Sequence, residues 1–299
     1  MSRPPVALVV GSAGQLGSDL IRVLADRGVA ATGWTRADLD VTDADAVGPA
    51  IAAWAAGTAG AGRPVVFNAT AWTDVDGAET AEAAAYAVNA VAPGLLGAAC
   101  AAADADLVHV STDYVFAGTA RTPYAEDAPV EPLGAYGRTK AAGEEAVLAS
   151  GARVYVVRTA WVYGATGRNF VKTMIRLERE RATLEVVDDQ LGSPTWSAQL
   201  ASGLLDLAAT RPDPGVYHLT SSGQTSWHGL ARAVFEEIGA DPQRVRAVPS
   251  SAFVRAAPRP SFSVLGRARW DAAGLPTPRD WRVALHEAFG QLGSALRQS

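Results

Sequence analysis

The sequence predicts an α/β protein built on a doubly wound, parallel β-sheet. Short apolar runs rich in β-branched residues recur at residues 6–10, 65–68, 107–111 and 154–158, with a weaker run at 30–34. Amphipathic stretches of helical character, such as residues 16–27 and 44–56, lie between these runs. Continuously apolar strands that alternate with helices are typical of a sheet covered by helices on both faces. In this architecture, ligands bind at the carboxyl ends of the strands.

The pattern loosens after residue 164, so we expect residues 1–164 to hold the main sheet and residues 165–299 to form a smaller α/β region. In the second region we expect helices at 169–180, 197–210, 227–239 and 281–297 and strands at 184–187 and 216–219. The strand near 215–220 is expected to return to the main sheet. No linker separates the two regions, which predicts that they pack directly on each other.

The composition excludes several classes of function. The 299 residues carry a net charge of −5, which argues against nucleic acid or an anionic membrane as partner. Cys100 is the only cysteine, so an internal disulfide and a thiolate zinc site are excluded, and no metal is predicted. Residues 83–103 are uncharged but contain Asn89 and Pro93, which favours buried helices over a membrane span. With no secretory signal visible, we expect a soluble cytoplasmic protein.

Three glycines directly after the first apolar run indicate a nucleotide site. Gly11, Gly14 and Gly17 form G-x-x-G-x-x-G between the first strand and the first helix. Glycines in this position permit a tight turn and let the backbone approach a pyrophosphate at the helix N-terminus. We therefore interpret residues 1–164 as a Rossmann-type dinucleotide-binding domain.

The end of the second predicted strand favours NADPH, with NADH as an alternative. NAD sites usually place an acid here, whereas this chain has Thr35 and Arg36, which can donate to a 2′-phosphate. Asp40 and Val41 follow closely and are expected to flank the adenine.

Tyr136 and Lys140 are the sharpest catalytic signal. They lie one helical turn apart, and Lys140 is one of only two lysines in a chain with 26 Lys and Arg residues. A lysine ammonium can lower the pKa of a neighbouring phenol and bind a cofactor ribose. Thr112, with Asp113 beside it, ends a buried strand and can share a carbonyl oxygen with the tyrosine. Together with the glycine turn, these residues resemble the extended short-chain dehydrogenases/reductases.

The resemblance reaches family level and runs through essentially the whole chain. Successive segments are similar to those of dTDP-4-dehydrorhamnose reductases, among them GSAGQLG, NATAWTDVDGAE, STDYVFAG, YGRTKAAGE, RTAWVYG, DDQLGSPT and RPSFSVL. The resemblance implies NADPH-dependent reduction of the 4-keto group of a dTDP-linked 6-deoxyhexose, most simply dTDP-4-dehydro-L-rhamnose. It also implies that residues 165–299 bind the sugar nucleotide.

Roles carried over by position follow from this resemblance. It implies Tyr136 and Lys140 as the catalytic pair, and Thr112 as a catalytic and substrate-binding hydroxyl. It implies cofactor contacts at Gly14, Gln15, Leu16, Ala71, Trp72 and Thr73. It implies substrate contacts at Asp113, Trp161, Asn169, Gln190, Thr195 and Arg259. Some relatives dimerise through a metal held by glutamates, but this chain has Asp19 near one such position and Ala198 near another, so no metal is predicted.

Two other classes of function remain open at this stage. One is a 4-ketoreductase or epimerase for another dTDP-deoxysugar of a specialised metabolite. The other is a non-catalytic NADP-binding regulatory subunit, against which the presence of both Tyr136 and Lys140 argues. A homodimer is the default expectation for a soluble oligomer.

Overall fold

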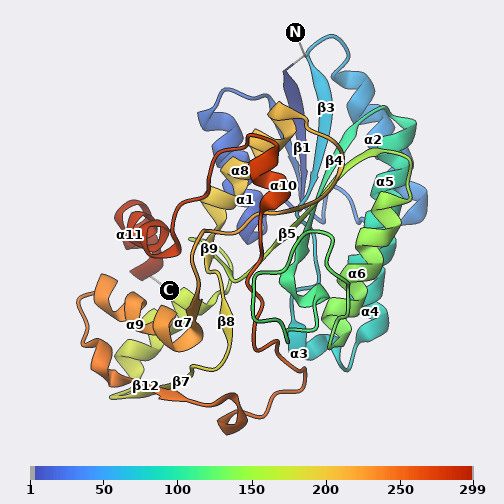
Figure 1. Ribbon diagram of the computed structural model, residues 1–299. Coiled ribbons are helices and arrows are strands. Elements are labelled where there is room, and N and C mark those ends of the chain that lie inside the picture. Colours follow the sequence, from blue (N-terminus) through green and yellow to red (C-terminus); the bar gives the residue numbers. More distant parts are fainter. Residues whose placement is uncertain (1–3, 298–299) are drawn as a thin grey trace.

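The computed structural model describes residues 4–297, and its main feature is a parallel sheet of six strands (Figure 1). In spatial order these are β10 (Gly215–His218), β5 (Arg153–Thr159), β4 (Asp106–Thr112), β3 (Arg63–Asn68), β1 (Pro5–Val10) and β2 (Ala31–Trp34). Every neighbouring pair is parallel. The order of the strands reverses between β1 and β3, the kind of switch point at which such sheets bind ligands. The predicted α/β class with a parallel sheet is confirmed.

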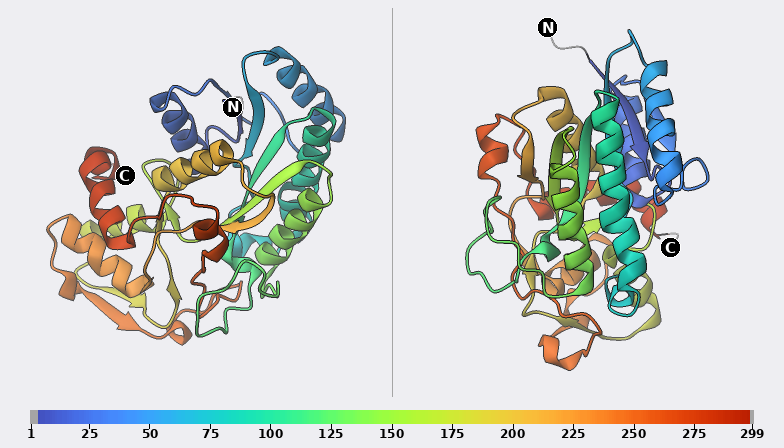
Figure 2. Two further views of the ribbon diagram at one scale, coloured as in Figure 1. Left: turned by 45° about the horizontal axis from the view of Figure 1, so that its top comes forward. Right: turned by 90° about the vertical axis from the view of Figure 1, so that its right-hand side faces the viewer.

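Helices cover both faces of this sheet, as Figures 1 and 2 show. One face carries α1 (Gln15–Asp26) and α8 (Ser197–Thr210), and the other carries α2 (Ala44–Gly57), α5 (Ala92–Ala102) and α6 (Ala135–Leu148). Alternate residues of β1 serve the two faces: Ala7 and Val9 join the core under α1 and α8, while Leu8 and Val10 join the core under α2 and α5. The strands are continuously apolar because both of their faces are buried.

The uncharged segment forms a helical run that packs into the core. It comprises α4 (Glu82–Tyr86), a π-helical turn (Ala87–Val91) and α5. By length and composition alone this run, Glu82–Ala102, is apolar enough to cross a membrane. Half of its apolar window is buried inside the protein, and α5 packs against α2 and α6.

A second lobe, drawn from residues after 160, has a core of its own. It contains α7 (Phe170–Glu180), α9 (Trp227–Glu237), α11 (Trp281–Arg297) and the parallel pair β7 (Leu184–Val187) and β12 (Val245–Val248). Shorter elements complete the chain: α3 (Val75–Ala78), α10 (Ala268–Ala272), β6 (Val162–Tyr163), β8 (Leu191–Gly192), β9 (Thr195–Trp196), β11 (Thr225–Ser226) and the 3-10 turns Asp113–Val115, Pro242–Arg244 and Ser250–Ala252. The same half of the sequence also supplies β10 and α8 to the main sheet, so the two regions interlock.

Candidate active site

A cleft of about 480 Å³ lies at the carboxyl ends of β1, β3, β4 and β5. Ten of the residues singled out in the sequence line it: Gly14, Gln15, Leu16, Ala71, Thr73, Thr112, Asp113, Tyr136, Lys140 and Trp161. They come from four strand ends, from α6 and from the beginning of the second lobe. The cleft therefore lies where a doubly wound sheet is expected to bind its ligand.

The glycine turn at the end of β1 is built for close backbone packing. Gly11 has a φ of +87°, which favours glycine. A Cβ on Gly17 would lie 2.1 Å from the carbonyl oxygen of Gly11, so no larger residue fits there. Helix α1 begins after Gly14 without a side-chain cap, which leaves its first backbone N–H groups available to an anion. These features fit the pyrophosphate of a dinucleotide.

The end of β2 contains a carboxylate that the sequence reasoning missed. The backbone N–H and the hydroxyl of Thr35 both donate to Asp38 at 2.8 Å, so the threonine closes a local turn. Arg36 is exposed and pairs with Asp40 at 3.1 Å. Asp40 also accepts from Thr42, and its neighbour Val41 is buried in the core. Of this group, Arg36 has the most exposed charge, since 87% of its side chain is exposed despite the pairing with Asp40.

Tyr136 and Lys140 lie on the first turns of α6, which is anchored where it begins. The carboxylate of Glu79 accepts the N–H of Ala135 at 2.8 Å and so caps the helix that carries both residues. Burial raises the pKa of the Tyr136 phenol to about 12, while a hydrogen bond with Thr112 opposes the rise. Burial lowers the pKa of Lys140 to about 8. Tyr136 is thus a protonated phenol at neutral pH.

The expected lowering of the tyrosine pKa by Lys140 is wrong for this structure. Nζ of Lys140 donates to the carbonyl oxygen of Val110 at 2.7 Å and lies 3.3 Å from Nε2 of His109. Desolvation of the phenol therefore dominates. A high pKa suits a proton donor in a reduction, since the proton is in place before the reaction.

Thr112 and Asp113 form a polar corner at the end of β4. Thr112 donates to Asp113 at 3.0 Å and accepts the N–H of Tyr114 at 3.2 Å, which holds both side chains beside Tyr136. Burial raises the pKa of Asp113 to about 6, although hydrogen bonds from Ser263 and Thr112 counteract it. The ring of Tyr114 meets that of Tyr136 edge to face at 5.6 Å.

Three buried polar atoms in the cleft lack a hydrogen-bond partner in the described part of the chain. They are Oγ of Ser111, Oδ2 of Asp113 and Oγ1 of Thr159. Buried polar atoms are normally paired in folded proteins. Three such atoms in one cavity indicate a ligand rich in hydroxyl or carbonyl groups.

Two tryptophans form the wall on the side of the second lobe. The indoles of Trp161 and Trp227 stack with centroids 3.5 Å apart and planes 6° apart. Trp161 has a φ of +48°, a conformation that is strained for a bulky residue and is concentrated at functional sites. Gly192 permits it, because a Cβ there would lie 2.4 Å from the Trp161 ring.

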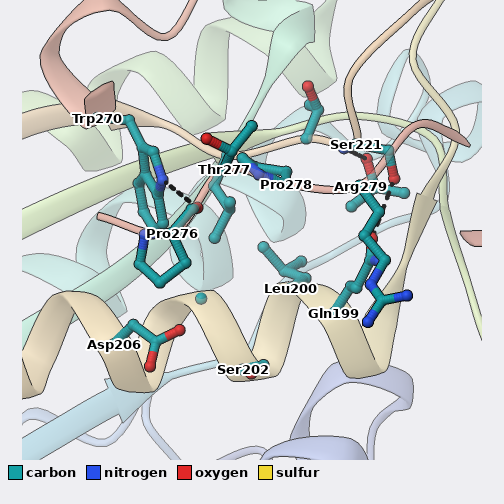
Figure 3. A pocket seen from close by; sticks show the side chains of 14 residues that line it. Gln199, Leu200, Ser202, Asp206, Ser221, Trp270, Pro276, Thr277, Pro278 and Arg279 are labelled. Carbon is teal, nitrogen blue, oxygen red and sulfur yellow. Dashed lines mark hydrogen bonds between the residues drawn. The ribbon is translucent and has the colours of Figure 1, made fainter. Parts of the chain in front are cut away.

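The other substrate residues expected from the sequence lie outside the lining of the cleft. Asn169 caps α7 and donates to Gln15 at 3.0 Å, so it positions a residue of the cleft. Arg259 pairs with Asp76 at 3.0 Å, and Gln190 immediately precedes β8. Thr195 lines a separate pocket of about 130 Å³ beside α8, shown in Figure 3.

Several residues expected to bind the cofactor also lie outside the lining of the cleft. Four belong to the glycine turn and the end of β2, and the other three are Asp40, Val41 and Trp72. The four are Gly11, Gly17, Thr35 and Arg36. The backbone N–H of Trp72 donates to the buried Asn89 at 2.8 Å, which ties the loop after β3 to the π-helical turn. Asp19, considered above for a metal, instead bonds Ser197 and pairs with Arg22.

Two cleft residues with a clear chemical character were missed in the sequence. Arg168 is exposed at the cleft and has no ion-pair partner within residues 4–297. Trp227 comes from α9, far from Trp161 in the chain. Arg168 immediately precedes Asn169, the N-cap of α7, and this position was the one local feature of the sequence that could have singled it out.

Tyr136, which is partly buried, and the buried Lys140 lie one helical turn apart and share one cleft with a nucleotide-type glycine turn. This combination places the protein among the NAD(P)-dependent oxidoreductases. The family model described as the RmlD substrate binding domain matches residues 6–294. The chain therefore belongs to this family, and the resemblance noted in the sequence is confirmed.

Individual relatives agree with this assignment. A dTDP-4-dehydrorhamnose reductase of Streptomyces griseus is 49% identical over 298 residues, which cover 96% of this chain and 94% of the relative. A protein of Streptomyces antibioticus named as a probable dTDP-4,6-dihydroxy-2-methyloxan-3-one 4-ketoreductase is 48% identical, covering 96% of both chains. A structure of dTDP-4-dehydrorhamnose reductase from Bacillus anthracis in complex with NADP matches with a TM-score of 0.90 and 32% identity, covering 97% of this chain and 100% of that one.

Proposed function

We propose that this protein reduces the 4-keto group of a dTDP-linked 4-dehydro-6-deoxyhexose with NADPH, and that its substrate is dTDP-4-dehydro-L-rhamnose. The observation that carries the proposal is the protonated Tyr136 in the same cleft as the unpaired polar atoms of Ser111, Asp113 and Thr159. A keto sugar supplies both the oxygen that Tyr136 can protonate and hydroxyl groups for the unpaired atoms. The reductases named above support the choice of sugar nucleotide.

The residues of the glycine turn fit the cofactor. Gly14, Gln15 and Leu16 line the cleft where the first N–H groups of α1 are available, and they would hold the pyrophosphate of NADPH. Arg36 would turn from Asp40 to the 2′-phosphate, as arginine binds phosphate with paired N–H donors. When bound, NADPH supplies the hydride that adds to the 4-keto carbon.

Tyr136 and Thr112 act on the carbonyl oxygen of the sugar. Negative charge develops on this oxygen during reduction, and Tyr136 donates its proton to it. The hydroxyl of Thr112 lies beside the phenol and would turn from Asp113 to donate to the same oxygen. Such donors are effective because they are already in place and shielded from water when the charge develops.

Charged and aromatic groups at the rim would hold the rest of the substrate. Arg259 is neutralised by Asp76, whereas Arg168 offers an unpaired positive charge to the diphosphate. The stacked Trp161 and Trp227 present a rigid apolar surface to a sugar ring or base. Gln190 and Thr195 shape the second lobe behind this wall. We also expect a cytoplasmic protein and, by default, a homodimer.

A second candidate is reduction of a different dTDP-4-keto sugar. The Streptomyces antibioticus protein described above favours it, as does a Streptomyces niveus protein, 44% identical, that is named dTDP-4-keto-6-deoxy-D-glucose reductase. The test is to incubate the purified protein with NADPH and each of several dTDP-4-keto-6-deoxyhexoses, measuring NADPH consumed per sugar. One NADPH consumed per dTDP-4-dehydro-L-rhamnose, at the highest kcat/KM of the set, supports the proposal. A higher kcat/KM for another sugar favours the second candidate. Conversion without NADPH consumption indicates an epimerase, and binding without conversion indicates a regulatory subunit.

A further inference from the structure

His109 lies in the middle of β4, fully buried beneath α6, and the proposed reaction gives it no role. Its two ring nitrogens face two different groups. Nδ1 lies 3.0 Å from Nδ2 of Asn68 on β3, and Nε2 lies 3.3 Å from Nζ of Lys140. A neutral imidazole has one donor and one acceptor nitrogen, so the identity of these partners determines where its proton lies.

The side-chain amide of Asn68 has a defined orientation. Its Oδ1 accepts the backbone N–H of Thr70 at 3.1 Å and the hydroxyl of Thr70 at 2.6 Å. A backbone N–H can only donate, so the oxygen must face Thr70 and the NH₂ group must face His109. Nδ1 of His109 therefore accepts from Asn68, and the ring proton lies on Nε2.

This tautomer points an N–H group at Lys140. A lysine ammonium has three donors and no acceptor, so the ammonium form places donor against donor. The neutral amine has a lone pair for the N–H of His109 and still donates to the carbonyl oxygen of Val110. Moving the ring proton to Nδ1 would only transfer the conflict to Asn68, whose amide cannot become an acceptor at that atom. In the geometry of the structure, loss of a proton from Lys140 relieves the conflict.

We propose that His109, held by Asn68 and Thr70 in the tautomer with its proton on Nε2, is a positioning residue that disfavours the ammonium form of Lys140. The inference rests on the proposed function, with Lys140 as the partner of Tyr136 that the family resemblance implies. It gives Lys140 a proton that is easily exchanged near neutral pH, beside the phenol that must be reprotonated after each turnover.

The surroundings of Lys140 agree with this arrangement. Burial and the nearby Lys140 hold the pKa of His109 well below its usual value, so the ring stays neutral. Burial lowers the pKa of Lys140. Glu144, one turn further along α6, acts in the opposite direction, but it forms a buried ion pair with Arg158 of β5 at 2.7 Å. Tyr136, one turn earlier, is the remaining titratable neighbour on the helix.

The two lysines of the chain make a direct test possible. In protein labelled with ¹³C at the lysine ε-carbon, only Lys140 and Lys172 give signals, and the Lys172→Arg variant assigns them. We expect the Lys140 signal to titrate with a midpoint near pH 8. In His109→Gln, the side-chain oxygen can accept from the ammonium, and the midpoint should rise by about one unit or more. An unchanged midpoint would show a merely structural role and overturn the proposal.

A second measurement identifies the tautomer in the wild-type protein itself. The ¹⁵N shifts of the imidazole in wild-type protein distinguish the tautomers, and His109→Asn, which keeps an acceptor for Asn68 but offers nothing to Lys140, assigns the signals. Protonated Nε2 and unprotonated Nδ1 near neutral pH are expected; a proton on Nδ1 contradicts the proposal. Neither measurement needs cofactor or sugar, so a failed reductase assay with the expected spectra would refute the proposed function alone.

Discussion

Replacing Asp113 with asparagine should stabilise the protein and impair its reaction. Asp113 is 2% exposed, and burial raises the pKa of its carboxyl from 3.8 to about 6. Each unit of pKa shift corresponds to about 1.4 kcal/mol, so keeping this carboxyl ionised lowers the free energy of unfolding by about 3 kcal/mol at neutral pH. Asparagine has the same shape without the charge and should recover most of this energy.

The pH dependence of the effect follows from the direction of the shift. The pKa is higher in the folded state than in the unfolded state, so the penalty is fully present above the folded-state pKa and absent below the unfolded-state pKa. The gain in stability of Asp113→Asn should be about 3 kcal/mol at about pH 7.5, about half of that at about pH 5, and near zero below about pH 3.5. For a chain of this length, 3 kcal/mol corresponds to a rise in Tm of about 5 °C.

Thermal unfolding of both proteins across this pH range is the assay. The control is Asp26→Asn on the exposed face of α1, which should change Tm little at any pH. Asp113 lines the cleft and its Oδ2 is unpaired, so kcat/KM should fall about ten-fold or more as a hydrogen bond to the substrate is lost. Equal Tm values at pH 7.5, or a difference that grows as the pH falls, would refute the reasoning.

Three further substitutions test the cofactor, the core and the rim of the cleft. Arg36→Ala should lower kcat/KM with NADPH about ten-fold or more and leave NADH largely unaffected, because one charged hydrogen bond to the 2′-phosphate is lost. Glu144→Gln should lower the free energy of unfolding, measured with urea, by about 3–5 kcal/mol, because it leaves the buried Arg158 without its ion-pair partner. Its control, Glu82→Gln in an exposed ion pair, should lower the free energy of unfolding by less than about 1 kcal/mol. Arg168→Gln should raise KM for the sugar nucleotide several-fold with little change in kcat, whereas Arg246→Gln on β12 should change neither.

Each of these has a contrary outcome. Equal losses with both cofactors would remove Arg36 from the 2′-phosphate site. Similar urea midpoints for the two glutamine variants would mean that the buried ion pair contributes no more to the free energy of unfolding than the exposed one. An unchanged KM in Arg168→Gln would assign the diphosphate to another cation.

Local patterns were sufficient to predict the sheet, the glycine turn and the Tyr136–Lys140 pair. The strands are apolar on both faces because helices cover both, and Gly14 and Gly17 are required by close contacts with Gly11 in the same turn. The helical spacing of Tyr136 and Lys140 is likewise a property of one helix. The order of neighbouring β3 and β4, in contrast, depends on how the whole sheet is assembled.

The contacts that could not be predicted from the sequence depend on this order of strands and on tertiary packing. Asn68 and His109 meet only because β3 and β4 are adjacent and in register, and Trp161 meets Trp227 only when α9 packs against the segment that follows β5. The predicted lowering of the Tyr136 pKa was wrong for the same reason, because the burial that raises it depends on tertiary packing. Near β2 the missed signal was local: Asp38 lies three residues after Thr35 and takes its hydroxyl.

The central claim, that Tyr136 is the proton donor in reduction of a dTDP-4-keto sugar, is tested most directly by comparing wild type with Tyr136→Phe. The measurement is the rate of NADPH oxidation in a single turnover with dTDP-4-dehydro-L-rhamnose, together with the Kd for NADPH. The account predicts an unchanged Kd and a rate lower by about 10²–10³-fold, the usual effect of removing one donor from a developing oxyanion. A Tyr136→Phe enzyme that oxidises NADPH at the wild-type rate would contradict it.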